Sequence, residues 1–250
     1  MTQAGTSIQT PESTRADTSF VLRRLHSLSG LVPIGLFLCY HIYENMTALR
    51  GPEAYNEMVN HVNALLPRQY FYALELVAII GPLLFHSLYG IYIASTGQSN
   101  VNAYPYSTNW SYWLQRISGY IAFVYLLVHV GVLRFAVTVG GNHLAPYSGP
   151  APGKLDLVTY DDVAAHLGNP DLMAVKSWMA GNHIFALYIV GTVLTIYHFT
   201  NGLNGFAWTW GIAVGRVAQR RVRILAWILF VLLAAATLNI LFKMRFGATA

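Results

Sequence analysis

Long apolar stretches separated by short polar ones run through most of this chain. A helix needs about 20 consecutive apolar residues to cross a bilayer, and five stretches reach that length. Tyrosine and tryptophan gather at their ends, where an amphipathic ring suits the boundary between lipid and water. The pattern predicts an all-α membrane protein in which five transmembrane helices form a bundle. The predicted spans cover roughly residues 25–46, 70–94, 112–139, 178–201 and 223–244.

The composition agrees with this class, because 55% of the 250 residues are hydrophobic and only 10% are charged. Residues 1–20 are polar and lack the apolar core and cleavage site of a signal peptide. We expect them to form a poorly ordered tail ahead of one transmembrane domain over 21–250. Residues 140–177 are expected to form an outer loop between the third and fourth spans.

The charges of the connections predict an orientation. With five spans, the tail, the turn at 95–111 and the loop at 202–222 lie on one side of the membrane. A dense group of arginines at 216–223 stands on that side, and basic connections usually face the cytoplasm. We therefore expect a cytoplasmic N-terminus. The net charge of +5 calls for no nucleic-acid partner, because basic loops against anionic lipid account for it.

Four histidines each stand alone in a separate apolar stretch: His41, His86, His129 and His198. An imidazole in hydrocarbon must be bonded or ligated. For a single such histidine, a hydrogen bond to a neighbouring carbonyl is as good an explanation as ligation. Four of them in four separate spans indicate one common function. Axial ligation of haem iron is a reason that covers all four.

The depths of these histidines predict how they pair. At about 1.5 Å of rise per residue, His41 and His129 both lie about 28 Å from the side on which their spans begin. The spans of His86 and His198 begin on the opposite side of the membrane, so these two histidines lie toward the cytoplasm. A haem held by two helices needs its ligands level, so we expect one haem between His41 and His129 and another between His86 and His198. The two haems would stack along the membrane normal.

The single cysteine, Cys39, excludes disulfides within the chain, thiolate-held iron–sulfur clusters and covalently attached haem. The chain also carries no nucleotide fingerprint for a flavin. The other five histidines divide by position. His26 near the start of the first span is expected to reach a haem propionate or a quinone, whereas solvated or interfacial roles are expected for His143, His166 and His183. His61 also lies in a polar connection, but it stands with Glu53 and Glu57 beside the expected outer haem.

Several runs resemble one family of membrane subunits. The most specific are RRLHSLSGLVPIGLFLCYH at 23–41, LLFHSLYGIYIA at 83–94, LQRISGYIAFVYLLVH at 114–129 and GTVLTIYHFTNGLNGFAWTWG at 191–211. They resemble the two-haem cytochrome b558 subunits of bacterial succinate dehydrogenases and fumarate reductases, and the resemblance covers roughly 20–240. It implies that the four histidines above are the axial ligands of two b haems. It further places propionate contacts near His26, Ser27, and Trp113 or Arg116.

The resemblance also implies partners. Subunits of this family anchor an iron–sulfur subunit, and through it a flavoprotein, to the bacterial cytoplasmic membrane. They pass electrons between the iron–sulfur subunit and a membrane quinone, usually menaquinone. Succinate oxidation would then take place on the other subunits of the enzyme.

Two features depart from the family pattern. Residues 140–177 are longer than the usual third connection, and DDVAAHL within them predicts a short outer helix. Ile196 stands where some related fumarate reductases carry a membrane glutamate, so a proton route through that position is not expected.

The quinone is expected at the outer end, beside His41, where the sequence gathers polar residues: Glu44, Asn45, Glu53, Glu57 and His61. His26, Ser27 and Arg24 form the alternative at the cytoplasmic end. Two rival functions stay open. A quinol-oxidising b-type cytochrome of another complex would place two histidines on each of two helices. A haem-free proton-coupled transporter would carry buried carboxylates beside its histidines. Glu75, near an outer span end, is the residue that comes closest to this pattern.

Overall fold

The structure is a computed structural model that describes residues 11–99, 101–135, 138–139, 142–143, 158–169 and 182–247. Five of its helical segments are long and apolar enough to cross a membrane, which confirms the predicted class and the five spans. Large apolar side chains cover much of their outer surface, as expected of a chain surrounded by lipid. The five segments are Thr18–Arg50, Arg68–Thr96, Ser107–Leu133, Asn182–Thr209 and Arg216–Phe246.

Most of these segments are single helices, but two are composite. The third, fourth and fifth spans are α6 (Ser107–Leu133), α8 (Asn182–Thr209) and α9 (Arg216–Phe246). The composite spans each contain a short π-helical segment. The first consists of α1 (Pro11–Ser29), η1 (Gly30–Gly35), α2 (Leu36–Asn45) and η2 (Met46–Arg50), and the second of α4 (Arg68–Glu75), η3 (Leu76–Ile80) and α5 (Gly81–Thr96).

Proline accounts for both π-helical segments. Pro33 lies inside η1, and Pro82 follows η3 at the start of α5. A proline has no N–H to donate and its ring crowds the carbonyl one turn earlier. The backbone around it therefore widens locally, and π-helical turns are a common form of that widening.

Three boundaries differ from those expected. α1 already begins at Pro11, inside the segment 1–20 that was expected to be a poorly ordered tail. Proline suits the first position of a helix because no N–H is needed there. α6 ends at Leu133 instead of 139. α8 continues to Thr209, although a loop was predicted over 202–222. The connection is only a turn at 210–215, which we call the α8–α9 turn. Gly211 stops α8 with a φ of 70°, and the Ile212 N–H bonds back to Ala207 O at 2.9 Å, as in a Schellman motif.

The connections contain shorter elements. α3 (Pro52–Ala64) joins the first two spans, and a pair of two-residue strands, β1 (Thr138–Val139) and β2 (Asn142–His143), follows the third. The short helix expected from DDVAAHL is confirmed as α7 (Tyr160–His166). Thr159 caps α7 with a capping box, in which its hydroxyl accepts from Asp162 N–H and the Asp162 carboxylate accepts from Thr159 N–H.

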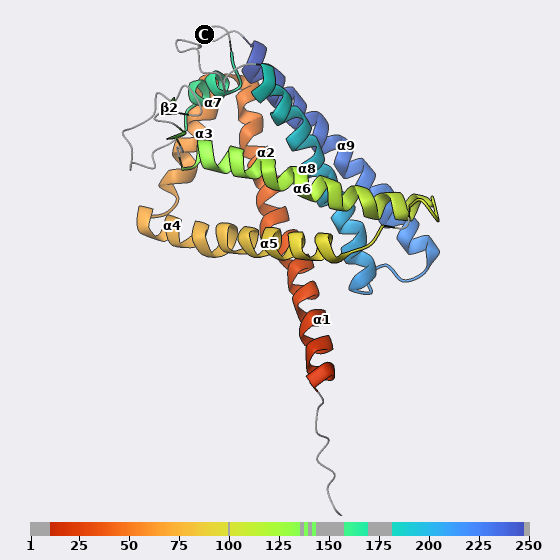
Figure 1. The fold of residues 1–250 in the computed structure, drawn as a ribbon. Helices are drawn as coiled ribbons and strands as arrows, with labels where there is room; N and C mark the ends of the chain where they lie inside the picture. Colours follow the sequence, from red (N-terminus) through yellow and green to blue (C-terminus); the bar gives the residue numbers. More distant parts are fainter. Residues whose placement is uncertain are drawn as a thin grey trace, which may run out of the picture.

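α8 packs along α9 on one side and against α6 on the other, while α4–α5 and α6 cross the first span (Figure 1). The largest buried cluster lies at the end of the molecule where α7 sits, and includes Tyr125, Tyr160, Tyr188 and Met244. We call this the α7 end. Hydrogen bonds hold α7 and the residues that follow it there: Tyr160 N–H donates to Asn56 Oδ1 at 2.9 Å, and Asn169 Nδ2, after the end of α7, donates to Met244 O at 2.8 Å.

One ion pair joins the second and third spans. Arg134, just after α6, donates through Nε and Nη2 to the two carboxylate oxygens of Glu75 on α4, each at 2.5 Å. The guanidinium also lies 5.5 Å from the centre of the Tyr72 ring. The carboxylate that the sequence singled out is thus neutralised by a neighbouring helix.

Candidate functional site

The four span histidines form two close pairs. The rings of His86 on α5 and His198 on α8 have centres 6.1 Å apart, and those of His41 on α2 and His129 on α6 have centres 5.9 Å apart. In both pairs the ring planes are nearly perpendicular, at 86° and 77°. The structure therefore brings together the partners that the depths predicted. We call them the turn-side pair (His86, His198) and the α7-side pair (His41, His129).

Backbone carbonyls fix the imidazoles of the turn-side pair. His86 Nδ1 lies 2.9 Å from His26 O, and His198 Nδ1 lies 3.0 Å from Gln115 O. A carbonyl only accepts, so both Nδ1 atoms must carry the hydrogen. This tautomer leaves the Nε2 lone pair of each ring available, which is the arrangement of a metal-ligating histidine whose other nitrogen is held by a carbonyl.

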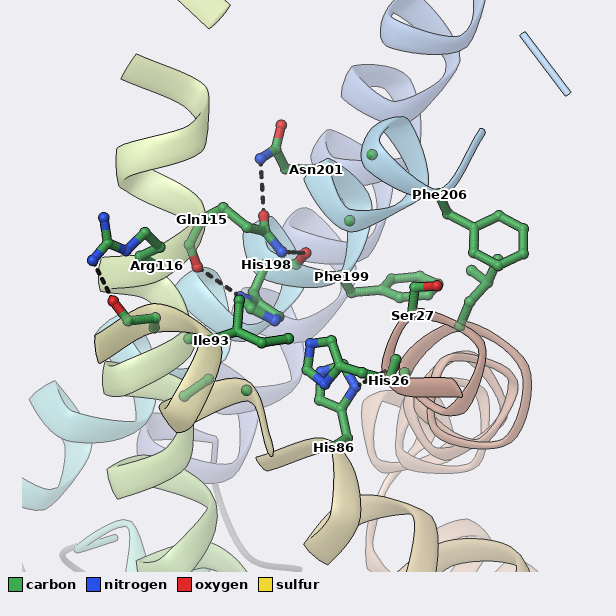
Figure 2. Close-up of a pocket in the computed structure, with 18 of the residues that line it drawn as sticks. His26, Ser27, His86, Ile93, Gln115, Arg116, His198, Phe199, Asn201 and Phe206 are labelled. Atoms are coloured by element: carbon green, nitrogen blue, oxygen red, sulfur yellow. Dashed lines mark hydrogen bonds between the residues drawn. The ribbon is translucent and has the colours of Figure 1, made fainter. Parts of the chain in front are cut away.

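A cavity of about 730 Å³ opens beside the turn-side pair, between the first span, α5, α6 and α8. Its wall is mostly apolar and includes Leu38, Phe123 and Phe199. Figure 2 shows the rings of His26, His86 and His198 gathered between these helices. A largely apolar cavity with a few convergent polar groups is the usual form of a cofactor site.

Glycines allow the helices to approach the histidines of this cavity. A Cβ at Gly119 would lie 2.9 Å from His198 Cε1, and one at Gly90 would lie 2.9 Å from His26 Cε1. A Cβ at Gly30 would collide with His86 Cε1. The rings therefore occupy space that any larger residue at these three positions would take.

Polar groups with unmet bonding capacity surround the same cavity. Arg116 donates through Nη2 to Gly97 O at 2.7 Å and to Ala94 O, but its buried Nε has no partner among the described residues. The same holds for His26 Nδ1 and Asn204 Oδ1. His26 stacks on His86 with ring centres 4.1 Å apart. These three polar atoms can therefore bond a group that is not among the described residues.

Two further predicted contacts lie differently. Ser27 lines the cavity, and its hydroxyl accepts from Trp210 Nε1 at 3.0 Å in the α8–α9 turn. Trp113 is not among the cavity-lining residues; its ring packs against Trp110 with centres 5.7 Å apart. Of the two alternatives for the third span, Arg116 is therefore the residue at the cavity.

Tyrosines surround the α7-side pair. His129 Nδ1 lies 3.3 Å from the Tyr188 hydroxyl, and the Tyr125 ring stacks on the His129 ring with centres 5.5 Å apart. A Cβ at Gly191 would collide with Tyr125, so this glycine makes room for the tyrosine. Across the pair, His41 lies near Asn45 Nδ2 at 3.4 Å and near the Glu44 carboxylate at 3.8 Å.

The residues predicted for a quinone fall into two groups. Glu44 and Asn45 lie beside His41, as just described. Glu53, Glu57 and His61 are spaced four residues apart on α3 and share its exposed face, while the opposite face carries Tyr55 against Tyr160 of α7. The structure therefore brings only the first group to the α7-side pair.

His166 corrects one expectation. It was expected to be a solvated loop histidine, but its side chain is fully buried and its ring centre lies 5.1 Å from that of Tyr188. Burial lowers the pKa of His166 from 6.5 to about 4. The expectation failed because α7 packs into the α7 end, which its polar sequence did not indicate. His61 and His183 are exposed, as expected.

Gln115 and Asn201 also belong to this site, although neither was predicted from the sequence. Gln115 Nε2 donates to His198 O at 2.9 Å, and Gln115 Oε1 accepts from Asn201 Nδ2 at 2.8 Å. These bonds join α6 to α8 beside the His198 ring (Figure 2). Both residues are amides inside apolar spans, and that rarity was the signal that could have found them.

No family model matches the chain. The chain is 37% identical over 223 residues to the succinate dehydrogenase cytochrome b558 subunit of Bacillus subtilis (strain 168). The match covers 89% of this chain and 96% of that protein. Identity at this level over nearly the whole of both chains shows that the chain belongs to the family of succinate dehydrogenase cytochrome b558 subunits.

Proposed function

We propose that this chain is the membrane anchor and electron-transfer subunit of a succinate:quinone oxidoreductase. In this role it carries electrons between a cytoplasmic iron–sulfur subunit and membrane menaquinone by way of two bis-histidine b haems. The observation that carries the proposal is the pair of ring spacings. Family membership supports it, because the relative is named as a cytochrome b subunit of that enzyme.

The ring spacings fit one iron between each pair. An imidazole nitrogen lies about 2 Å from a metal that it ligates and about 1 Å from its own ring centre, so two imidazoles on one metal have ring centres about 6 Å apart. The observed values are 6.1 and 5.9 Å. A histidine pair that only formed hydrogen bonds to neighbouring groups would have no reason to keep this spacing twice. The cavity beside His86 and His198 adds room for a macrocycle.

The residues around the turn-side pair have distinct roles toward such a group. His86 and His198 would bind iron through Nε2, while His26 O and Gln115 O hold their Nδ1–H groups and raise the basicity of the ligands. Arg116, His26 and Ser27 would hold the propionates, because unmet donors stand on Arg116 and His26. At the other pair, Tyr188 holds His129. Haem iron, when bound, supplies a one-electron redox centre whose potential these ligands and their surroundings set.

The proposed orientation puts the N-terminus and the α8–α9 turn in the cytoplasm. Arg216, Arg220 and Arg221 are exposed beside this turn, where they can face lipid headgroups or a partner. The turn-side pair then holds the inner haem, close to the iron–sulfur subunit. The α7-side pair holds the outer haem.

The test is spectroscopic. The purified complex should show two b haems per copy of this chain in a reduced-minus-oxidised spectrum. His41→Leu or His129→Leu should remove the outer component first, and His86→Leu or His198→Leu the inner one. The pairing is wrong if loss of His41 removes the same component as loss of His86 while leaving that of His129. Absence of haem from the intact complex would favour the transporter reading.

We further propose that the quinone reacts at the outer end, because a second haem is useful only if electrons travel to the far side. Glu44 and Asn45 would then bond the quinone carbonyls beside His41. Glu44→Gln and Asn45→Leu should reduce quinone reduction several-fold and weaken inhibitor binding while both haems stay bound. A matched Arg24→Gln substitution at the inner end should change neither. The reverse pattern would move the quinone to the inner end.

A further inference from the structure

The most unusual polar group outside the two pairs is the imidazole of His166. Its side chain has no exposed surface, and neither Nδ1 nor Nε2 has a hydrogen-bond partner among the described residues. A buried polar group without a hydrogen-bond partner destabilises a protein, and such groups in native proteins usually mark a missing partner. Because both ring nitrogens of His166 lack partners, we expect a hydrogen-bonding group beside this ring.

The position of His166 indicates what that partner is. One tyrosine ring, that of Tyr188, separates it from the α7-side pair: Tyr188 lies 5.1 Å from the His166 ring centre and 5.7 Å from that of His129. The same tyrosine holds His129 Nδ1 through its hydroxyl. His166 and His129 therefore both contact Tyr188, and His166 stands close to any group that His41 and His129 would hold.

The neighbourhood calls for an anionic acceptor. A b haem carries two propionates at its edge, and a carboxylate in a water-poor region needs donors. Imidazole has an N–H to give in either protonation state. Two tyrosine hydroxyls of the same buried cluster already have partners, since Tyr188 Oη lies 3.3 Å from His129 Nδ1 and Tyr160 Oη donates to Lys243 O at 3.5 Å.

We propose that His166 donates a hydrogen bond to a propionate of the haem held by the α7-side pair. α7 would then be a cap that completes this haem site from the long connection between the third and fourth spans. The connections at Asn56 and Asn169 hold α7 in the required place. This inference rests on the proposed function, because it needs a haem between His41 and His129.

The test is a redox titration of the intact complex with variants of His166. A donor beside a propionate offsets its negative charge, so losing it should stabilise the oxidised iron. His166→Phe should therefore shift the outer haem to a lower midpoint potential and leave the inner haem unchanged. His166→Gln keeps an N–H donor and should restore the potential of the outer haem toward that of the parent protein.

His183→Phe is the matched control, because it makes the same substitution at an exposed histidine. Redox-difference infrared spectra with haem labelled with ¹³C at the propionates give a second readout. The labelled carboxylate band should move in His166→Phe and stay in His183→Phe. An equal shift in both variants, or none in His166→Phe, overturns the inference.

If His166→Phe loses the outer haem, His166→Gln decides: retention with the parental potential supports the donor role, and loss overturns it. Failure of the proposed function is seen separately. In that case the parent complex lacks two b haems, or His41→Leu leaves the outer component intact, before any variant of His166 is compared.

Discussion

At the scale of single residues, glycines without a Cβ allow neighbouring helices to contact the histidine rings. Gly30 leaves room for the His86 ring, which cannot move aside without losing the bond from its Nδ1 to His26 O. Gly119 does the same for His198, whose Nδ1 is bonded to Gln115 O. The glycines and the carbonyls act together, because the carbonyls hold each ring in place and the glycines leave the space for it.

Gly30→Ala should therefore displace His86 and reduce the content of the inner haem, while the outer haem is retained. Haem content and the α-band of the reduced spectrum measure this. Gly205→Ala is the matched control, since a Cβ there meets nothing within 4 Å. It should leave both haems in place and stabilise α8 by about 0.5–1 kcal/mol. Parental spectra for Gly30→Ala would show that the close approach is dispensable.

At the scale of elements, polar bonds between spans replace the hydrophobic effect, which does not draw helices together inside lipid. Gln115 and Asn201 join α6 to α8, and Arg134 and Glu75 join the second span to the third. The side chains of Arg134 and Glu75 are 26% and 18% exposed, so neither charge is fully solvated if its partner is lost.

Arg134→Leu alone should lower the free energy of unfolding by about 1–3 kcal/mol, because it leaves the Glu75 carboxylate half-buried and unpaired. The double variant Glu75→Leu/Arg134→Leu should recover most of that loss. Unfolding in detergent micelles measures both, and haem content serves as the check that the site is intact. If the double variant is no more stable than Arg134→Leu, the cost lies in packing instead of in the unpaired charge.

At the scale of the whole molecule, one end presents an apolar surface next to charge. Ile212 and Val214 in the α8–α9 turn are 66% and 79% exposed, beside the exposed Arg216 and Arg220. An exposed apolar patch rimmed by charge is typical of a protein interface. This surface fits the proposed iron–sulfur subunit, which must come close to the inner haem.

A cysteine introduced as Val214→Cys, in a background with Cys39→Ser, should react several-fold more slowly with a water-soluble maleimide when the iron–sulfur subunit is bound. The reason is that the partner would cover the turn. Leu65→Cys, at the exposed end of α3, should react equally in both states. Equal reactivity of Val214→Cys with and without the partner would place the interface elsewhere.

The sequence by itself determined the class, the five spans, the four span histidines and their pairing, because apolar length and the depth of a residue along a helix are local properties. It also located α7 from the segment DDVAAHL. It did not determine where α8 ends, since Phe206 and Trp208 suit a helix as well as an interfacial loop and Gly211 decides between them.

Only the tertiary structure decided the surroundings of those residues. The burial of His166, the exposure of Glu53 and Glu57, and the bonds from Gln115 to His198 depend on which faces of distant helices meet. A polar segment has the same local sequence pattern whether it is solvated or, like α7, packed into an end of the protein. The difference arises from packing across more than a hundred residues of sequence, as where Asn56 holds Tyr160, and no local pattern encodes it.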